Sequence, residues 1–395
     1  MGHEELALLL VPAAAVSAAV LAAAIGRVAR IPIVVFEIVL GLLLGPSLLG
    51  WVEPTAVTET LAELGLAMLF FMAGNEIDFS AIRGRPLRRA GLGWLVSLVA
   101  GVAAGVLIAP DLSAGAIIGI ALGSTALGTI LPIVRDTGEL HRPFGRTITA
   151  VGAAGEFGPL LAISIFLSGR KPGAATVVLL VFVVIAAAAV WWASRGPHTS
   201  LHGLVAATLH TSGQFAIRLV LLLVAALVTL SMVLGLDMLL GAFAAGVLWR
   251  LLVAEAPEHD RELVESKIEA VGYGFLVPVF FISTGVTFEL AALLDDPGAL
   301  ALVPVFVVLL LLVRGLPGLL AAPVGSSGAD KRAIALFCAT GLPIIVAVTS
   351  IGVDAGLLAE TTAAALVGAG MVSVLLFPLV ALAQRPTPAV APVHR

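Results

Sequence analysis

Charged side chains are scarce in this sequence. Asp, Glu, Lys and Arg together make up 12% of the 395 residues, whereas hydrophobic residues make up 60% and the mean hydropathy is +1.14. In soluble domains about a quarter of the residues are charged. The composition therefore excludes an ordinary soluble domain and indicates an α-helical protein that crosses a membrane many times.

The sequence has one cysteine, and its histidines lie outside the long apolar runs. The single cysteine, Cys338, excludes an intrachain disulfide and offers no spacing for a metal site. None of the seven histidines lies in a long apolar run, so histidine cannot carry a proton at the membrane midplane. The apolar runs also lack a nucleophile–histidine arrangement. We expect no enzyme, no cofactor, no resident metal and no nucleic-acid partner.

Thirteen apolar stretches come close to the ~20 residues that cross a bilayer. They lie near residues 6–25, 31–50, 58–76, 88–108, 113–134, 144–168, 173–194, 213–234, 236–253, 271–287, 298–322, 332–352 and 357–383. The predicted fold is an all-α polytopic membrane protein with about thirteen transmembrane helices.

The basic residues predict how these helices are oriented. If the connecting loops alternate between two sides, one side holds only Arg170 and Lys171, and Arg314 lies within a span. Every other Lys and Arg falls on the opposite side. Because cytoplasmic loops carry the excess of basic residues, we expect an inner-membrane protein with the N-terminus outside and the C-terminus cytoplasmic.

Glu156 is an acid in the middle of an apolar run. It is the only ionisable side chain between Thr147 and Leu167, and Arg314 is similarly isolated between Leu300 and Ala322. An ionisable group at this depth costs about 2.5–3.5 kcal/mol on insertion scales and by default marks a transport pathway or proton relay. We expect Glu156 to bind a cation or a proton. Arg314 is either a structural charge or a direct participant.

Three pairs of segments resemble each other, and the predicted orientation sends the two members of each pair across the membrane in opposite directions. This pattern indicates two inverted six-helix repeats. The pairs are residues 37–41 and 237–241, 70–79 and 280–290, and 124–133 and 339–344. The predicted organisation is a first repeat at 1–168, a linker helix and cytoplasmic link at 169–212, a second repeat at 213–384 and a cytoplasmic tail at 385–395.

The third pair predicts two discontinuous helices. Each member interrupts its span with glycine and proline, at Gly128 and Pro132 in the first and at Gly341 and Pro343 in the second. Proline removes a backbone donor and disrupts the preceding turn. Matched interruptions in the two halves point to a binding site at the midplane, although a single proline kink would be ordinary.

Hydroxyl groups accompany both interruptions. Thr125 and Thr340 could offer oxygen ligands to a monovalent cation, or each could simply bond back to its own helix. The acids Glu37, Glu76, Asp78 and Asp237 lie near the ends of spans, where we expect solvated or helix-capping roles instead.

The chain resembles the monovalent cation:proton antiporters, in the branch with Kef-like and Nap/Nha-like carriers. Four stretches carry the resemblance: Arg30-Ile-Pro-Ile with the glycine-rich segment 40–50, residues 70–78 with Gly-Asn-Glu-Ile-Asp, residues 240–246, and residues 278–285 with Phe-Phe-Ile-Ser-Thr-Gly. The resemblance implies a homodimer in which each protomer has a dimerisation domain and a six-helix core where the discontinuous helices cross.

The resemblance also implies roles for particular residues. Gly155-Glu156 occupies the position of the family's acidic pair, and Arg314 that of a nearby basic residue. The sequence departs from the family here, because relatives usually have two acids, or Asn and Asp, at the pair, and several have Lys for Arg314. Asn75 likewise replaces a usual Leu. These departures affect ion selectivity and stoichiometry.

We expect an antiporter that exchanges Na⁺ or K⁺ for H⁺ by alternating access in the lipid bilayer. We expect the exchange to be electroneutral, because Glu156 is the one group left to titrate within the membrane. Two alternatives remain. One is a Kef-like potassium efflux protein, against which the lack of a C-terminal regulatory domain argues. The other is a sensor that retains the fold without transport, against which Glu156 and both interruptions argue.

Overall fold

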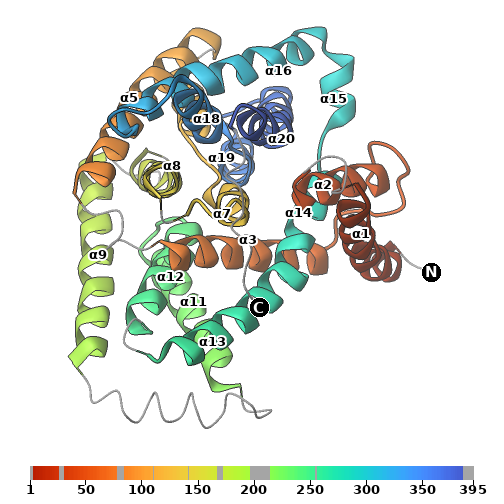
Figure 1. Ribbon diagram of the computed structural model, residues 1–395. Coiled ribbons are helices and arrows are strands. Elements are labelled where there is room, and N and C mark those ends of the chain that lie inside the picture. The colour runs from red at the N-terminus through yellow and green to blue at the C-terminus, as the bar shows by residue number, and fades with distance from the viewer. Residues whose placement is uncertain are drawn as a thin grey trace. The chain divides into compact units, whose positions relative to one another are not determined.

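The computed structural model describes residues 3–25, 31–77, 84–109, 111–140, 142–166, 172–195, 214–253 and 256–385 (Figure 1). These parts of the chain are helical and contain no strand. Asp78, the loop with Arg170 and Lys171, most of the predicted cytoplasmic link and the tail beyond Arg385 lie outside the described residues.

In chain order the α-helices are α1 (His3–Ile25), α2 (Ile33–Leu44), α3 (Ala56–Glu76), α5 (Arg85–Ile108), α6 (Leu112–Leu122), α7 (Leu127–Asp136), α8 (Pro143–Phe166), α9 (Pro172–Arg195), α11 (Phe215–Val233), α12 (Met238–Leu252), α13 (Glu258–Val271), α14 (Val277–Val286), α15 (Leu290–Asp295), α16 (Pro297–Leu309), α17 (Leu316–Gly318), α18 (Gly328–Ala339), α19 (Pro343–Asp354) and α20 (Glu360–Ala383). Two π-helical segments, η1 (Gly272–Leu276) and η2 (Leu310–Gly315), and a 3₁₀ turn, η3 (Leu319–Ala321), continue some of them.

The predicted spans are confirmed. Among the described residues, ten helical stretches are long and apolar enough to cross a membrane. Three shorter apolar helices, at Ile33–Leu44, Gly173–Ala189 and Met238–Leu252, occupy the other predicted positions. Each expected span therefore has a helix, as hydrophobic length dictates where backbone polar groups must be satisfied internally.

The helices form two compact units. Unit 1 comprises Met1–Ala15, Val52–Ile77 and Leu160–Ser283, and unit 2 comprises Val16–Trp51, Asp78–Pro159 and Thr284–Arg395. Each unit combines segments from the first and second halves of the sequence. The compact units are thus distinct from the two sequence repeats, whose boundaries stay a prediction.

The core of unit 1 is built around α3, α11 and α12. Met68, Phe71 and Trp249 are almost completely buried in it. Gly246 lets α12 lie directly on α3, because a Cβ at this position would overlap the carbonyl oxygen of Phe71. Small residues allow such close approach in membranes, where packing replaces the hydrophobic effect between helices.

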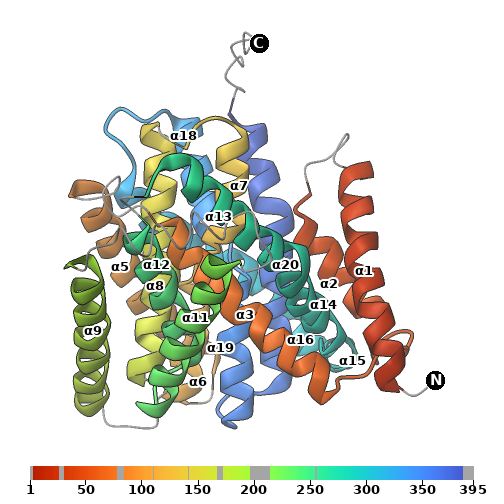
Figure 2. The ribbon, with the colours of Figure 1, turned by 90° about the horizontal axis from the view of Figure 1, so that it is seen from below.

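Unit 2 contains both discontinuous helices. The first is α6 followed by α7, and the second is α18 followed by α19 (Figure 2). The part of α8 up to Pro159 and the whole of α20 belong to the same unit. The end of α7 and the start of α18 lie near the same end of the unit, since Arg385 bonds to the segment after α7 and to the first turn of α18. We call this the basic end. The two discontinuous helices therefore run in opposite directions.

Two of the acids near the ends of the predicted spans have different environments in the structure. Asp237 caps α12 by accepting a hydrogen bond from the backbone N–H of Leu239 (2.8 Å), as expected. The expectation for Glu37 is wrong. Glu37 lies beyond the first turn of α2 and is 3% exposed, because the end of α14 packs on α2 from Ile38 to Gly45.

Gly246→Ala tests the close packing in unit 1. The added methyl must push α3 and α12 apart, and overpacking of this kind costs about 1–3 kcal/mol. Thermal unfolding of the purified protein in detergent should show a lower Tm. Gly91→Ala on α5 is the matched control, because its Cβ would meet no neighbour within 4 Å. Equal Tm values for the two variants would contradict the packing.

Candidate functional site

The first discontinuity lies between α6 and α7. Residues 123–126 are not helical, and they include Ser124 and Thr125. The backbone N–H of Thr125 donates to the carbonyl oxygen of Gly155 on α8 (3.0 Å). The next N–H, of Ala126, donates to the carbonyl oxygen of Thr340 (2.8 Å). Backbone groups released by the interruption are thus satisfied by neighbouring helices rather than by water.

The second discontinuity lies between α18 and α19, at residues 340–342. Gly341 lies within it, and Pro343 is the first residue of α19, where its missing N–H costs nothing. The hydroxyl of Ser373 on α20 lies within hydrogen-bonding distance of both the N–H (3.2 Å) and the carbonyl oxygen (3.1 Å) of Gly341. The Ala126–Thr340 bond joins the two interruptions, so the discontinuous helices meet there.

The predicted position of the first interruption is wrong by several residues. Gly128 and Pro132 lie inside α7, which begins at Leu127. The helix instead stops at Leu122, before the segment whose N–H groups bond to Gly155 and Thr340. Tertiary hydrogen bonds, and not the proline, determine where this helix is interrupted.

Arg314 is the central buried charge of unit 2. It lies in the π-helical segment η2 and is 0% exposed. Its Nε donates to the hydroxyl of Thr125 (2.7 Å), and its Nη2 donates to the carbonyl oxygen of Val151 on α8 (2.7 Å). Its Nη1 has no hydrogen-bond partner among the described residues.

The Thr125 hydroxyl is the link between Arg314 and the second discontinuous helix. It accepts from Arg314 and donates to the carbonyl oxygen of Cys338 (2.7 Å) in the last turn of α18. The Thr340 hydroxyl behaves differently, because it donates to the carbonyl oxygen of Leu336 (3.0 Å) in its own helix. The helix-bonded alternative therefore holds for Thr340, whereas Thr125 connects three elements.

Gly155 leaves the space that Arg314 and Thr125 fill. A Cβ at this position would lie 2.5 Å from Nη2 of Arg314 and 2.5 Å from the Thr125 hydroxyl oxygen. A second acid cannot fit here unless both side chains move. The absence of the usual acidic pair and the presence of the buried arginine are therefore parts of one arrangement.

Glu156 follows Gly155 on α8 and is 3% exposed. Successive helical residues are about 100° apart around the axis, so its side chain leaves α8 in a different direction from that in which Arg314 approaches. The site thus combines a buried carboxylate, a fixed cation and two interrupted helices. Hard oxygen ligands and a titratable group are what binding of a monovalent cation or a proton requires.

Several groups that support the site cannot be identified from the sequence. The carbonyls of Val151 and Cys338 carry no residue-type signal, and Ser373 reads as an ordinary small residue of a membrane helix. Trp94 on α5 lies against α8 where Gly158 has no side chain. This contact of Trp94 with Gly158, one turn beyond Gly155, depends on tertiary packing, which the periodicity of the sequence cannot reveal.

A cavity of about 270 Å³ lies in unit 2, beside the half of α19 that leads away from the second interruption. Its lining is rich in hydroxyl and carboxylate groups and includes Thr349, Ser350, Asp354, Glu289 and Glu360. Val346, one turn into α19, also lines it. The cavity therefore extends along α19 in the direction of the interruption.

Comparisons with known proteins find a transporter family model and a solved structure that are similar to this chain. The family model described as "Sodium/hydrogen exchanger, transmembrane" matches residues 15–382. The solved structure of the sodium proton antiporter MjNhaP1 from Methanocaldococcus jannaschii at pH 8 has a TM-score of 0.66 to this chain and is 16% identical. The match covers 96% of this chain and 99% of that chain, and it establishes similarity of fold.

Curated relatives match parts of the chain. The Na⁺/H⁺-K⁺ antiporter GerN of Bacillus cereus is 26% identical over 269 residues, which are 65% of this chain and 66% of GerN. The Na⁺/H⁺ antiporter of Enterococcus hirae is 26% identical over 273 residues, covering 66% and 68%. YjbQ of Bacillus subtilis (strain 168) is 27% identical over 307 residues, 73% of this chain but only 48% of YjbQ.

The two threonines offer a matched test of the site. Thr125→Val removes the acceptor of a buried arginine and the donor to Cys338, and such losses cost about 1–3 kcal/mol for each unsatisfied group. Thr340→Val removes only a bond within its own helix. Thermal unfolding in detergent should show a clearly lower Tm for Thr125→Val and a Tm near wild type for Thr340→Val. A larger effect at Thr340 would contradict the assignment.

Proposed function

We propose that this chain, which belongs to the transmembrane sodium/hydrogen exchanger family, exchanges a monovalent cation, Na⁺ or K⁺, for H⁺ across the membrane. The observation that carries the proposal is the buried carboxylate of Glu156, on α8 beside the backbone that bonds the first helix interruption. Intramembrane acids at paired discontinuous helices are typical of ion-coupled carriers.

The relatives favour antiport over the alternatives. GerN and the Enterococcus hirae protein are named as antiporters of Na⁺, and GerN also of K⁺. This favours an antiporter over a Kef-like efflux protein. A sensor without transport would have no need of a buried acid beside two interrupted helices, so we place it second.

Glu156 couples the two substrates by competition. Its carboxylate holds either a proton or a cation, and the carrier changes access only when the carboxylate is loaded. Thr125 is a candidate cation ligand, but its hydroxyl accepts a hydrogen bond from Arg314 and donates one to the carbonyl oxygen of Cys338. We therefore assign Thr125 to positioning of Arg314, Thr340 to a structural role, and Arg314 to charge compensation.

Arg314 supplies a fixed positive charge to the site. Arginine cannot lose its proton at accessible pH. Its neighbour Thr125 follows the C-terminus of α6, and the Cys338 carbonyl lies in the last turn of α18. Helix C-termini carry partial negative charge, so these two half-helices stabilise the buried guanidinium.

Alternating access requires two routes to the interruptions. The cavity beside α19 is a candidate for the route opposite the basic end, because the hydroxyl and carboxylate groups in its lining suit a hydrated cation. By the positive-inside rule this opposite end faces outward. We also propose that two copies of the chain associate in the bilayer, as the family resemblance implies.

The proposal is tested by reconstituting the full chain in proteoliposomes with an internal pH dye. Addition of Na⁺, K⁺ or Li⁺ in turn should move protons with at least one of the first two. A protein that binds the cations without any proton movement would be a sensor. Cation flux without proton movement would instead indicate an efflux protein.

Glu156→Gln should abolish cation-driven proton movement, because the amide can neither release a proton nor offer a charged ligand. Glu156→Asp should retain part of the activity with an altered half-saturating cation concentration, since the carboxylate survives but retreats by one methylene. Asp295→Asn, at the exposed end of α15 and outside the cavity lining, is the control for loss of an acid elsewhere in unit 2. More than half of wild-type exchange in Glu156→Gln would refute the role of Glu156.

Exchange should be electroneutral, with one proton per cation. A second carboxylate is missing at Gly155, and Arg314 cannot carry the second proton that a lysine could. Loading Glu156 with H⁺ or with Na⁺ gives the same charge, so no net charge moves in a cycle. With Na⁺ as substrate and a valinomycin-imposed K⁺ potential, the exchange rate should be nearly independent of voltage.

The opposite result is easy to recognise. One net charge per cycle would be worth about 2.3 kcal/mol per 100 mV, and the rate would then respond strongly to the potential. A sustained current on a solid-supported membrane would also contradict electroneutrality. The voltage-insensitive result must be accompanied by active exchange in the same vesicles.

A further inference from the structure

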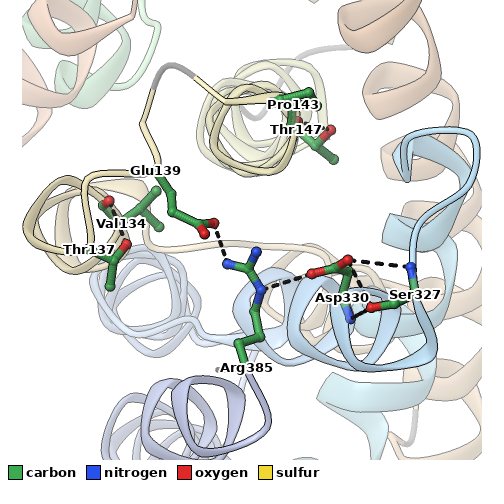
Figure 3. A network of polar contacts seen from close by, with 8 residues as sticks. All are labelled: Val134, Thr137, Glu139, Pro143, Thr147, Ser327, Asp330 and Arg385. Atoms are coloured by element: carbon green, nitrogen blue, oxygen red, sulfur yellow. Dashed lines mark hydrogen bonds and ion pairs between the residues drawn. The ribbon is translucent and has the colours of Figure 1, made fainter. Parts of the chain in front are cut away.

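A partly buried ion-pair cluster joins several elements at the basic end of unit 2. Arg385, just beyond the end of α20, donates through Nη1 to Oε2 of Glu139 and through Nε to Oδ1 of Asp330 (2.9 Å). Figure 3 shows the guanidinium between the two carboxylates. The side chains of Arg385 and Glu139 are only 19% and 5% exposed, so this is not an ordinary surface ion pair.

Each partner of Arg385 belongs to an element that leads to the site. Glu139 lies in the short connection between α7 and α8, the helix of Glu156. Asp330 lies in the first turn of α18, where it forms a capping box with Ser327. The bridge therefore ties the halves of the two discontinuous helices at the basic end, α7 and α18, to the end of α20. We call these two helices the basic halves.

An aromatic contact adds α8 to the same cluster. The Arg385 guanidinium carbon lies 3.6 Å from the centroid of the Phe144 ring, in the first turn of α8. Phe144 also packs edge-on against Phe337 of α18, with ring centroids 6.2 Å apart. Arginine suits this place because its planar fork can pair with two carboxylates and stack on a ring, which lysine cannot do.

We propose that Arg385 is a positioning residue that clamps the basic halves, α7 and α18, to α8, so that the interruptions and Glu156 change access as one body. We call Arg385, Glu139, Asp330 and Phe144 the Arg385 clamp. The backbone bonds at Thr125 and Ala126 attach the same helices at a second level. Phe144 and Glu156 are twelve residues apart, or about 18 Å along α8, and two attachments so far apart prevent the helices from sliding or splaying.

Loss of Arg385 would leave the attachment at the interruptions, the Phe144–Phe337 ring contact and the Arg332–Gln384 bond. The basic halves could then separate from α8 in local openings that the intact cluster suppresses. Cys338 is a built-in reporter of such openings, because it is the only cysteine in the sequence and is 1% exposed on α18. Its thiol is packed against Gly318 and is reached by a reagent only when α18 moves.

The first test measures how fast a membrane-permeant maleimide labels Cys338 in the full chain, well below the Tm of each variant. Arg385→Ala should label about tenfold faster than wild type, because local openings that expose Cys338 become more frequent when the clamp is lost. Arg385→Lys, which keeps the charge but not the fork, should fall between them. Lys331→Ala is the matched control, because it removes an exposed charge from the first turn of α18 without touching the clamp.

The second test concerns exchange and rests on the proposed function. In proteoliposomes normalised for folded protein, Arg385→Ala should lower turnover about five- to tenfold and leave the half-saturating cation concentration within about twofold, since the clamp acts on movement rather than on ligands. Glu139→Gln should have a similar effect. The double variant should be no slower than Arg385→Ala, because both changes break one interaction.

The outcomes separate the claims. Labelling and turnover of Arg385→Ala equal to those of Lys331→Ala would overturn the proposal. Faster labelling with unchanged turnover would overturn the role in exchange. If Arg385→Ala does not fold, Arg385→Lys and Glu139→Gln carry both comparisons. If wild type exchanges no cation, the proposed function fails while the labelling still decides whether the clamp exists.

Discussion

The burial of the Arg314 guanidinium is the constraint on which the rest of unit 2 depends. A charge removed from water at this depth must be compensated and hydrogen-bonded. Here the compensation is made by the Thr125 hydroxyl and the Val151 carbonyl, from two different elements. Thr125 then fixes the last turn of α18 through the Cys338 carbonyl. One side chain thus sets the mutual positions of both interruptions and of α8.

This arrangement explains why the helix that carries the acid also carries a glycine. Arg314 and Thr125 occupy the volume that a side chain at position 155 would need. Glu156 remains as the titratable group next to them. The proposed antiport with a single proton follows from steric exclusion of a second carboxylate as much as from the identity of the basic residue.

The sequence predicts the helices far better than it predicts the contacts. Span positions follow from hydrophobic length, because the bilayer imposes that length on every helix. Gly128 and Pro132 do not mark the first interruption, which lies before Leu127, because backbone bonds to Gly155 and Thr340 determine its position. Glu37 is buried because α14 packs on α2, and no local pattern encodes that contact. The Arg385–Glu139 bridge joins residues 246 positions apart, beyond the reach of any periodicity.

The central claim is that one carboxylate, Glu156, binds either the proton or the cation. Its most direct test is to count the protons released when purified protein in weakly buffered detergent solution is saturated with Na⁺ or K⁺. About one proton should be released for each cation bound, and none should be released from Glu156→Gln. Cation binding without proton release in the wild type, or undiminished release from the variant, would contradict it.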